Sequence, residues 1–586
     1  MSADRLPLRL AASTLGVLLT ARLLVVIALG ATTSVWTPVA LMWQDIGVAA
    51  TAGLLTAALR SHRIAWVLYA ALVGYAAINV PATIVLGSPL TPTMLAAAGG
   101  ALSDSVVHHL TTANVLRLLL VVGAGVLFPP LSIAVVGPRR PAAWAVALVS
   151  IAMFGPIAAS RSETAGLDRN AITALTASAW RDRVSADAPD ESSARAWRTS
   201  PAGATTTGAE PDLSAYRGAA RGFNVVLVVL ESTAAAYLRP YGATDDPMPA
   251  LTRLSQQALV FDAAYAVYPE SVKGLYATLC GRLPIFGVQA SAHATLPCAS
   301  VARSFSDAGY QTGLFHSGRF RYLGMDALVE QQGYQVAEDA GAIGGQVESS
   351  FGVDESATVS RMLGWIDAQP AHAPFLLTYL PIAGHHPYAA SRRDPFTGDS
   401  EFDRYRNALG DADRALDALL AGLRVRALDS HTLIVVVGDH GEAFGQHRGN
   451  SGHTLFIYDE NVRVPYFIWL AGRLTAPLHV PRAASLVDTG ATLRDLTGLP
   501  PDDRDEGTSL VAPGSRMALF FADYSLGWMG LRDGCWKYLY ETEARRSHLH
   551  DVCSDTGERQ NLASREPVRA ALYEARVQSW LDAGQR

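Results

Sequence analysis

Residues 432–442 read TLIVVVGDHGE, an apolar strand-like run that leads directly into Asp439, His440, Gly441 and Glu442. An adjacent Asp and His can both reach one cation if the chain turns sharply, and Gly441 permits such a turn. Mixed oxygen and nitrogen donors suit Zn²⁺ or Mn²⁺ better than Ca²⁺, with Mg²⁺ as a further candidate. Glu442 has two interpretations: it orients His440, or it begins the next helix.

Three other apolar runs each lead into a carboxylate or an imidazole: NVVLVVL (224–230) before Glu231, QTGLF (311–315) before His316, and FLLTYL (375–380) before His385 and His386. Short apolar runs that alternate with longer helical patterns are typical of an α/β domain with a mainly parallel sheet. Ligands bind outside the carboxyl ends of the strands in such sheets. We therefore expect these polar residues to converge at one edge, although any one of them alone could cap a helix.

Ser271, in PESVKGLY (269–276), is the candidate nucleophile. The residues after it, through Leu279, have a helical pattern, which places Ser271 at a helix N-terminus where backbone N–H groups favour an anion. Metal coordination would lower the pKa of its hydroxyl, and Lys273 is close enough to pair with a phosphate oxygen; an ordinary N-cap is the alternative. Imidazoles and guanidinium groups bind phosphate oxygens or protonate a leaving group, which adds as candidates His316, Arg319, Arg321, His385 and His453.

The first 160 residues are strongly apolar and nearly free of charge, whereas residues 161–586 have an ordinary globular composition. About twenty apolar residues cross a bilayer, and five stretches have that length: 10–31, 38–59, 64–87, 115–136 and 141–160. Arg22 and Asp45 lie inside two of them. Such charges are costly in lipid and often functional, or else they mark ends that are placed wrongly.

Basic residues flank alternate ends of these stretches: Arg5 and Arg9, then Arg60 and Arg63, then Arg139 and Arg140. The positive-inside rule puts the N-terminus in the cytoplasm and everything after residue 160 outside. We therefore expect a multi-pass protein of the bacterial inner membrane, with a transmembrane domain (1–160), a linker (161–221) that has some helix near 170–183, and a periplasmic catalytic domain (222–586).

The net charge of −6 gives no indication of nucleic-acid binding. All four cysteines, Cys280, Cys298, Cys535 and Cys553, lie in the outer part, where an oxidising compartment favours disulfides. Local pairing of Cys280 with Cys298 and of Cys535 with Cys553 is the simplest arrangement, although four cysteines allow three connectivities.

The order Glu231-Ser232, Ser271, His385-x-Pro387, Asp439-His440-Gly441-Glu442 resembles the alkaline-phosphatase/sulfatase superfamily. Residues 549–562 are similar to the family's closing pattern LYDL…ExxNL, and 248–254 are similar to its TPNLDxLA. The resemblance spans about 222–565. With five membrane spans in front, the chain resembles the lipoteichoic-acid synthase, phosphoglycerol transferase and phosphoethanolamine transferase group. The fold implied is a five-helix transmembrane bundle followed by a sulfatase-like α/β domain with a mainly parallel central sheet.

This resemblance implies an enzyme that moves phosphoglycerol or phosphoethanolamine from a phospholipid donor to an envelope glycan or lipid acceptor through a covalent Ser271 intermediate. One divalent metal ion would be bound by Glu231, Ser271, Asp439 and His440. His385 and His453 would act in catalysis, and the substrate would contact Lys273, His316, Arg321 and His386.

The sequence departs from the group's pattern at three points. Ser271 stands where the group usually has Thr, the spacing from His440 to His453 differs by one residue, and the Trp and Arg that grip glycerol phosphate lack a clear counterpart near His316. The alternative is a membrane-anchored sulfatase-like hydrolase or phosphodiesterase. Leu275 stands where the sulfatase maturation motif requires Arg, so maturation of Ser271 is not expected.

Overall fold

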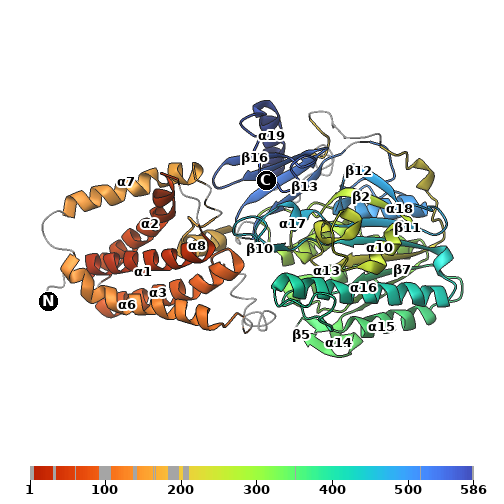
Figure 1. Ribbon diagram of the computed structural model, residues 1–586, viewed down its shortest axis with the longest axis horizontal. Helices are drawn as coiled ribbons and strands as arrows, with labels where there is room; N and C mark the ends of the chain where they lie inside the picture. The colour runs from red at the N-terminus through yellow and green to blue at the C-terminus, as the bar shows by residue number, and fades with distance from the viewer. Residues whose placement is uncertain are drawn as a thin grey trace. The chain divides into compact units, whose positions relative to one another are not determined.

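The computed structural model describes residues 6–30, 34–59, 61–91, 107, 109–135, 141–162, 164, 166–181, 197–201, 210–349, 351–514, 516–524 and 526–583 (Figure 1). The chain divides into two compact units. The first holds residues 1–183 together with 447–451 and 542–546, and the second holds the rest of the chain.

The first unit is helical. Its helices are α1 (Leu6–Leu29), α2 (Thr37–Ala58), α3 (His62–Leu86), α6 (Thr112–Val135), α7 (Pro141–Ser160) and α8 (Ala171–Arg181). Among the described residues, four helices are long and apolar enough to cross a membrane, namely α1, α2, α3 and residues 112–132 of α6, and the apolar part of α7 is a shorter fifth. The predicted N-terminal bundle is therefore confirmed, and α8 matches the helix expected near 170–183.

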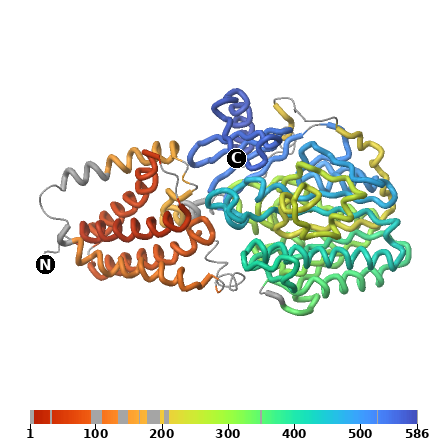
Figure 2. The backbone as a smooth tube through the Cα atoms, viewed as in Figure 1, coloured from red at the N-terminus to blue at the C-terminus, as the bar shows by residue number. Residues whose placement is uncertain are grey.

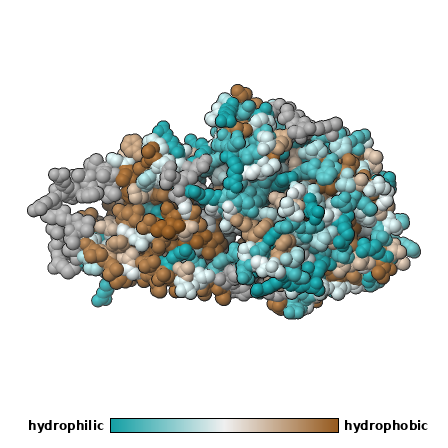
Figure 3. Space-filling model, viewed as in Figure 1, coloured by the Kyte–Doolittle hydropathy of each residue, from teal (hydrophilic) through white to brown (hydrophobic). Residues whose placement is uncertain are grey.

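Many large apolar side chains lie on the surface of this bundle as well as in its core. Ile27 and Leu54 are 71% and 73% exposed, and Figure 3 shows hydrophobic surface gathered over the N-terminal helices. A contiguous apolar surface of this kind is costly in water and is typical of contact with lipid. The chain is thus a multi-pass membrane protein.

The second unit is built on an eight-stranded sheet in the order β12-β2-β11-β8-β1-β7-β3-β4. The strands are β1 (Asn224–Leu230), β2 (Ala258–Tyr265), β3 (Gln311–His316), β4 (Val336–Glu338), β7 (Phe375–Leu380), β8 (Thr432–Gly438), β11 (Tyr466–Leu470) and β12 (Leu478–Ser485). β11 is antiparallel to both of its neighbours. The four strands predicted from the sequence are the contiguous parallel set β8-β1-β7-β3, so the mainly parallel sheet is confirmed.

Helices cover both faces of the sheet because alternate residues of each buried strand point to opposite sides. Val225, Leu227 and Val229 pack into one core, with α11 (Ser271–Cys280), α12 (Val301–Asp307), α13 (Met325–Gln332) and α18 (Thr489–Thr497). Val226 and Val228 pack into the other core, with α10 (Pro249–Ser255), α15 (Glu355–Asp367) and α16 (Glu401–Val425). Because β8, β1, β7 and β3 are parallel, the residues that follow them emerge at one edge of the sheet.

A smaller C-terminal layer completes this unit, and the backbone trace in Figure 2 ends there. It consists of β13 (Ala518–Ala522), β14 (Trp528–Asp533), β15 (Trp536–Glu541), β16 (Arg546–Asp551) and α19 (Pro567–Ala583). Trp197, from the segment predicted as a linker, is buried in the core of this layer. Arg198 forms a buried two-point ion pair with Asp488 at 2.6 and 2.7 Å.

Both disulfides form locally, Cys280–Cys298 and Cys535–Cys553. The pairing favoured by the sequence is therefore confirmed.

Candidate active site and the relatives of the fold

Glu231, Asp439 and His440 form a buried cluster at the carboxyl edge of the sheet. Glu231 follows β1, and Asp439 and His440 follow the neighbouring β8. One ligand atom from each of the three lies within 4.8 Å of the others. Ser232 fixes Asp439, because its backbone N–H donates to Asp439 Oδ1 at 2.9 Å.

The buried charges of this cluster shift the pKa values of its two carboxyl groups in opposite directions. Burial, followed by the charge of Glu231, raises the pKa of Asp439. Burial opposes ionisation of Glu231 as well, but the hydrogen bond and charge of His440 outweigh it and hold the pKa of Glu231 below its usual range. Two buried carboxylates beside one imidazole repel each other unless a cation lies between them. The donor set of two oxygens and one nitrogen therefore fits Zn²⁺ or Mn²⁺.

Ser271 lies beside this cluster as the first residue of α11. Its Oγ is 3.1 Å from Glu231 Oε2 and 3.4 Å from His440 Nε2. The cap of the helix is Glu270, whose carboxylate accepts from the N–H of Val272 at 2.8 Å. Because Glu270 caps the helix, the hydroxyl of Ser271 is not engaged as the cap and faces the cluster. This arrangement removes the ordinary N-cap interpretation of Ser271.

His440 of the cluster and three histidines around it are held in the same manner, each through Nδ1. The partners of Nδ1 are the carbonyl oxygen of Leu380 for His316 (2.9 Å), of His386 for His385 (2.6 Å), of Gly441 for His440 (2.9 Å), and the carboxylate of Glu442 for His453 (2.8 Å). Holding Nδ1 fixes the ring and leaves Nε2 to face a ligand or substrate. Burial lowers the pKa of both His316 and His385, which favours their neutral forms at pH 7.

Glu442 neither orients His440 nor begins a helix. Its Oε2 accepts from His453, and its Oε1 accepts from the Tyr388 hydroxyl at 3.1 Å. The rings of His453 and His440 lie 4.3 Å apart between centroids, and those of His453 and His385 lie 6.3 Å apart. Glu442 therefore fixes an imidazole beside the metal-type cluster.

The other predicted substrate contacts lie in different surroundings. Lys273 is buried, and its ammonium group pairs with Asp523 at 2.8 Å and lies 4.2 Å from the centre of the Tyr268 ring. This carboxylate partner neutralises the charge of the lysine, and contact of Lys273 with a substrate stays a prediction. Arg321 is exposed on the segment after β3. The ring of His386 lies edge-on to Tyr388, with 5.2 Å between centroids.

Three polar residues near the site have contacts that the sequence motifs do not predict. Glu270 caps α11, Asp523 neutralises Lys273, and Glu355 lies under the ends of β3 and β7. A sequence signal existed only for Glu270, because an acid directly before a helical pattern is a common cap. Asp523 is 250 residues from Lys273, so local patterns could not reveal the pairing.

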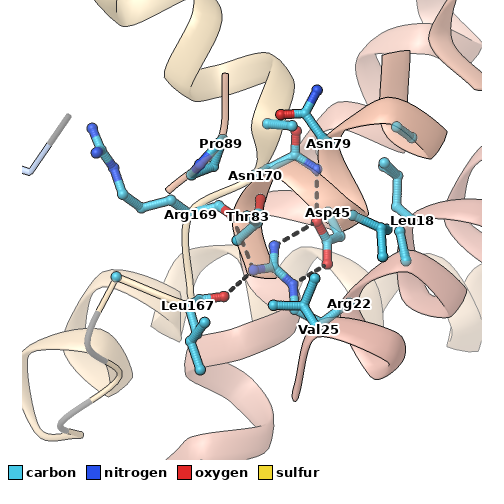
Figure 4. A pocket seen from close by; sticks show the side chains of 15 residues that line it. Leu18, Arg22, Val25, Asp45, Asn79, Thr83, Pro89, Leu167, Arg169 and Asn170 are labelled. Carbon is cyan, nitrogen blue, oxygen red and sulfur yellow. Dashed lines mark hydrogen bonds and ion pairs between the residues drawn. The ribbon is translucent and has the colours of Figure 1, made fainter. Parts of the chain in front are cut away.

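A second polar cluster lies inside the membrane unit (Figure 4). Arg22 on α1 and Asp45 on α2 form a two-point ion pair at 2.8 and 3.0 Å, and their side chains are only 12% and 2% exposed. Asn170 donates to the same carboxylate at 2.6 Å, and Arg22 donates to the carbonyl oxygens of Leu167 and Arg169. A pocket of about 50 Å³ adjoins the pair, but these contacts show the polar groups occupied with one another. Arg22 and Asp45 are thus buried within the bundle, and they do not mark misplaced span ends.

Comparison with known proteins agrees with this geometry. A family model described as Sulfatase matches residues 223–499. The chain is 23% identical over 315 residues to a lipoteichoic acid synthase-like protein, YvgJ, of Bacillus subtilis, which covers 50% of this chain and 49% of that protein. It is 25% identical over 339 residues to human N-acetylgalactosamine-6-sulfatase, which covers 49% of this chain and 64% of that protein. The chain therefore matches only 49% and 64% of the length of these two relatives.

Among solved structures, the lipoteichoic acid synthase LtaP from Listeria monocytogenes superposes with a TM-score of 0.52 at 17% identity, covering 64% of this chain and 95% of that one. At this level of identity the likeness concerns the fold. The family match, the sheet order and the strand-end cluster agree. In the sequence, four long apolar helices and a shorter fifth come first, and the domain that follows them belongs to the sulfatase/alkaline phosphatase superfamily.

Proposed function

We propose that the chain is a metal-dependent transferase that moves phosphoglycerol or phosphoethanolamine from a phospholipid to an extracytoplasmic acceptor, with Ser271 as the nucleophile. One observation carries the proposal: the Ser271 hydroxyl, at the start of α11, lies 3.1 Å from Glu231 and 3.4 Å from His440. A hydroxyl beside a buried cation-type cluster and a helix N-terminus is suited to attack a phosphate ester.

Glu231, Asp439 and His440 would hold the cation, with Ser271 as a further ligand. A bound divalent cation would lower the pKa of the Ser271 hydroxyl so that it loses its proton, and would draw charge from the transferred phosphoryl group. The N–H groups of Val272 and Lys273 at the start of α11 are held by the carboxylate of Glu270, so in this proposal the cation, and not the helix end, draws this charge.

The transfer has two balanced steps. Ser271 Oγ forms a bond to phosphorus while the bond from phosphorus to the diacylglycerol oxygen breaks, and His453 gives that oxygen a proton. In the second step the acceptor hydroxyl oxygen forms a bond to phosphorus and its proton passes to His453. The bond from phosphorus to Ser271 Oγ breaks, and Ser271 leaves in the deprotonated form that began the first step. Glu442 suits His453 to this role because it holds Nδ1 and leaves Nε2 toward the site. His316 and His385 would contact phosphate oxygens, with Arg321 and His386 as outer contacts.

The membrane unit supports a lipid donor. The basic residues Arg60, Arg63, Arg139 and Arg140 favour a cytoplasmic side for the connections that contain them. By this rule the domain after α7 faces the periplasm, where an envelope glycan or lipid would be the acceptor. The domain limits proposed are 1–160 for the membrane part, 161–221 for the linker and 222–586 for the catalytic part.

The test is mass spectrometry of the purified full-length protein after incubation with mixed bacterial phospholipids and Mn²⁺ or Zn²⁺. We expect added mass on Ser271 that matches phosphoglycerol or phosphoethanolamine, together with released diacylglycerol. Ser271→Ala should abolish both products, whereas Ser271→Thr keeps the hydroxyl and should retain them.

The neighbouring Ser232 provides an internal control, because its hydroxyl also lies within 2.9 Å of Glu231. Peptide mapping should find the adduct on Ser271 and not on Ser232. If neither adduct nor diacylglycerol forms, a phospholipid donor is excluded. The alternative, a sulfatase-like hydrolase or phosphodiesterase at the same site, then accounts better for the chain. Transfer to water after adduct formation would equally favour the hydrolase.

A further inference from the structure

Glu355 is a buried carboxylate below the active-site edge that the proposed chemistry does not use. It is the first residue of α15, and only 6% of it is exposed. Its Oε1 accepts from the Ser317 hydroxyl at 2.8 Å and from the backbone N–H groups of Ile382 and Ala383 at 2.9 and 3.1 Å. Its Oε2 accepts from the Tyr379 hydroxyl.

These four donors belong to two neighbouring strand ends. Ser317 directly follows β3, Tyr379 belongs to β7, and Ile382 and Ala383 follow β7. The strands pair in register as far as His316 with Leu380, and beyond that point the ladder ends. Ser317 itself bonds to the end of β7, because its N–H donates to Leu380 O at 3.2 Å and its hydroxyl accepts from the Ile382 N–H at 2.8 Å. The carboxylate of Glu355 adds contacts to both chains and joins them where they separate. A buried acid with four hydrogen-bond donors is held firmly in place.

Both strand ends lead to a histidine of the site. His316 directly precedes Ser317, and its Nδ1 bonds to Leu380 O at 2.9 Å. His385 follows the Ile382 turn, and its backbone N–H donates to Ile382 O at 2.9 Å. The orientation of both imidazoles therefore depends on the main chain that Glu355 holds.

We propose that Glu355 is a positioning residue that sets His316 and His385 against the transferred phosphate by joining the ends of β3 and β7. It acts through the main chain and does not touch the substrate. The inference rests on the proposed function for its effect on catalysis, but the joining of the two strand ends can be tested without any activity.

Two variants separate geometry from charge. Glu355→Gln keeps the size and leaves an oxygen for Ser317, Ile382 and Ala383, while its amide faces the Tyr379 hydroxyl, which can accept as well as donate. Glu355→Ala removes all four contacts. Asp354→Ala is the matched control. The Asp354 carboxylate caps the same helix by accepting from the Ala357 N–H at 2.9 Å, and it contacts neither strand end.

The first measurement is hydrogen–deuterium exchange of the full-length protein in detergent. We expect the peptide that contains residues 380–386 to exchange at least tenfold faster in Glu355→Ala, with little change in Glu355→Gln. Peptides from α11 should be unchanged in both. Ser317→Ala is unsuitable as a milder variant, because the Ser317 hydroxyl also accepts directly from the Ile382 N–H at 2.8 Å. Tyr379→Phe removes one donor to Glu355 and is the milder variant if Glu355→Ala does not fold; it should give a smaller increase in the same peptide. Unchanged exchange in both Glu355→Ala and Tyr379→Phe would overturn the proposal.

The second measurement is diacylglycerol release at varied phospholipid concentration. We expect kcat/KM to fall at least tenfold in Glu355→Ala and to stay within about threefold of wild type in Glu355→Gln and Asp354→Ala. Equal losses in Glu355→Ala and Asp354→Ala would overturn the proposal, since loosening of the helix alone would suffice. Loss in Glu355→Gln without faster exchange would overturn it in favour of direct action by the charge. If wild type itself releases no diacylglycerol, the proposed function fails, while the exchange experiment still decides whether Glu355 joins the strands.

Discussion

At the scale of single residues, Asp439 and Glu442 are three positions apart in the sequence but have different roles. Asp439 belongs to the cation-type cluster, whereas Glu442 holds His453 at 2.8 Å. We predict that Asp439→Ala loses both bound metal and activity. Glu442→Gln should keep the metal but lose about tenfold or more in kcat, because the carboxylate that faces His453 is gone and general acid–base catalysis contributes about 10²–10⁴. Metal analysis of both purified variants beside their turnover rates checks this. A fully metallated Asp439→Ala protein would contradict its role.

His293 shows how one buried imidazole makes folding depend on pH. Its Nε2 accepts from the N–H of Ile285 at 3.0 Å, and its Nδ1 donates to the carbonyl oxygen of Gln289 at 2.9 Å, so the ring fits only in its neutral form. Burial, aided by the charge of Lys273, lowers its pKa from 6.5 to about 4. The stability that it contributes is therefore complete above pH 6.5 and is lost as pH falls toward 4.

His293→Gln removes this titration. We expect the variant to be less stable than wild type at pH 7.5, and the difference to narrow by about 2 kcal/mol at pH 5, where the wild-type imidazole resists protonation. Thermal unfolding of the detergent-solubilised proteins at the two pH values measures the difference. A constant difference would show that His293 is not held neutral.

At the scale of elements, Arg22 on α1 and Asp45 on α2 link two membrane helices and the chain before α8. Removing one partner leaves an uncompensated buried charge, which costs about 3–5 kcal/mol. We predict that Asp45→Leu destabilises the bundle by about that amount and that Arg22→Met combined with Asp45→Leu recovers most of it. Thermal unfolding in detergent checks both variants. Additive losses in the double variant would indicate separate roles for the two residues.

The strands that carry the site could be predicted from the sequence, because each is a continuous apolar run that leads into a polar residue. A buried parallel strand needs apolar residues on both faces, and Glu231, His316 and Asp439 then follow from chain order alone. The partners of these residues could not be predicted. Lys273 pairs with Asp523, which lies far away in the sequence. Both sequence interpretations of Glu442, as a partner of His440 or as the start of a helix, are replaced by its contact with His453. Such side-chain pairs form only where segments that are distant in the sequence, or separate loops, come together in the folded chain.

At the scale of the whole molecule, the sidedness of the domain can be tested through its own cysteines. All four are paired, as Cys280–Cys298 and Cys535–Cys553, and such bonds persist in an oxidising compartment. If the domain faces the periplasm, maleimide added to cells before lysis should label none of the four cysteines unless a reductant is added first. A cytoplasmic domain would have reduced cysteines that are labelled directly.

Because the native cysteines are paired and should not react with maleimide, introduced cysteines can report on each side of the membrane. Ser34 lies between α1 and α2, and Ser61 lies between α2 and α3, beside Arg60 and Arg63. Because basic residues favour the cytoplasmic side, a membrane-impermeant maleimide should label Ser34→Cys in intact spheroplasts and Ser61→Cys only after permeabilisation. The reverse pattern would place the domain after α7 in the cytoplasm. An envelope acceptor would then be out of reach, and the transferase proposal would fail even with Ser271 intact.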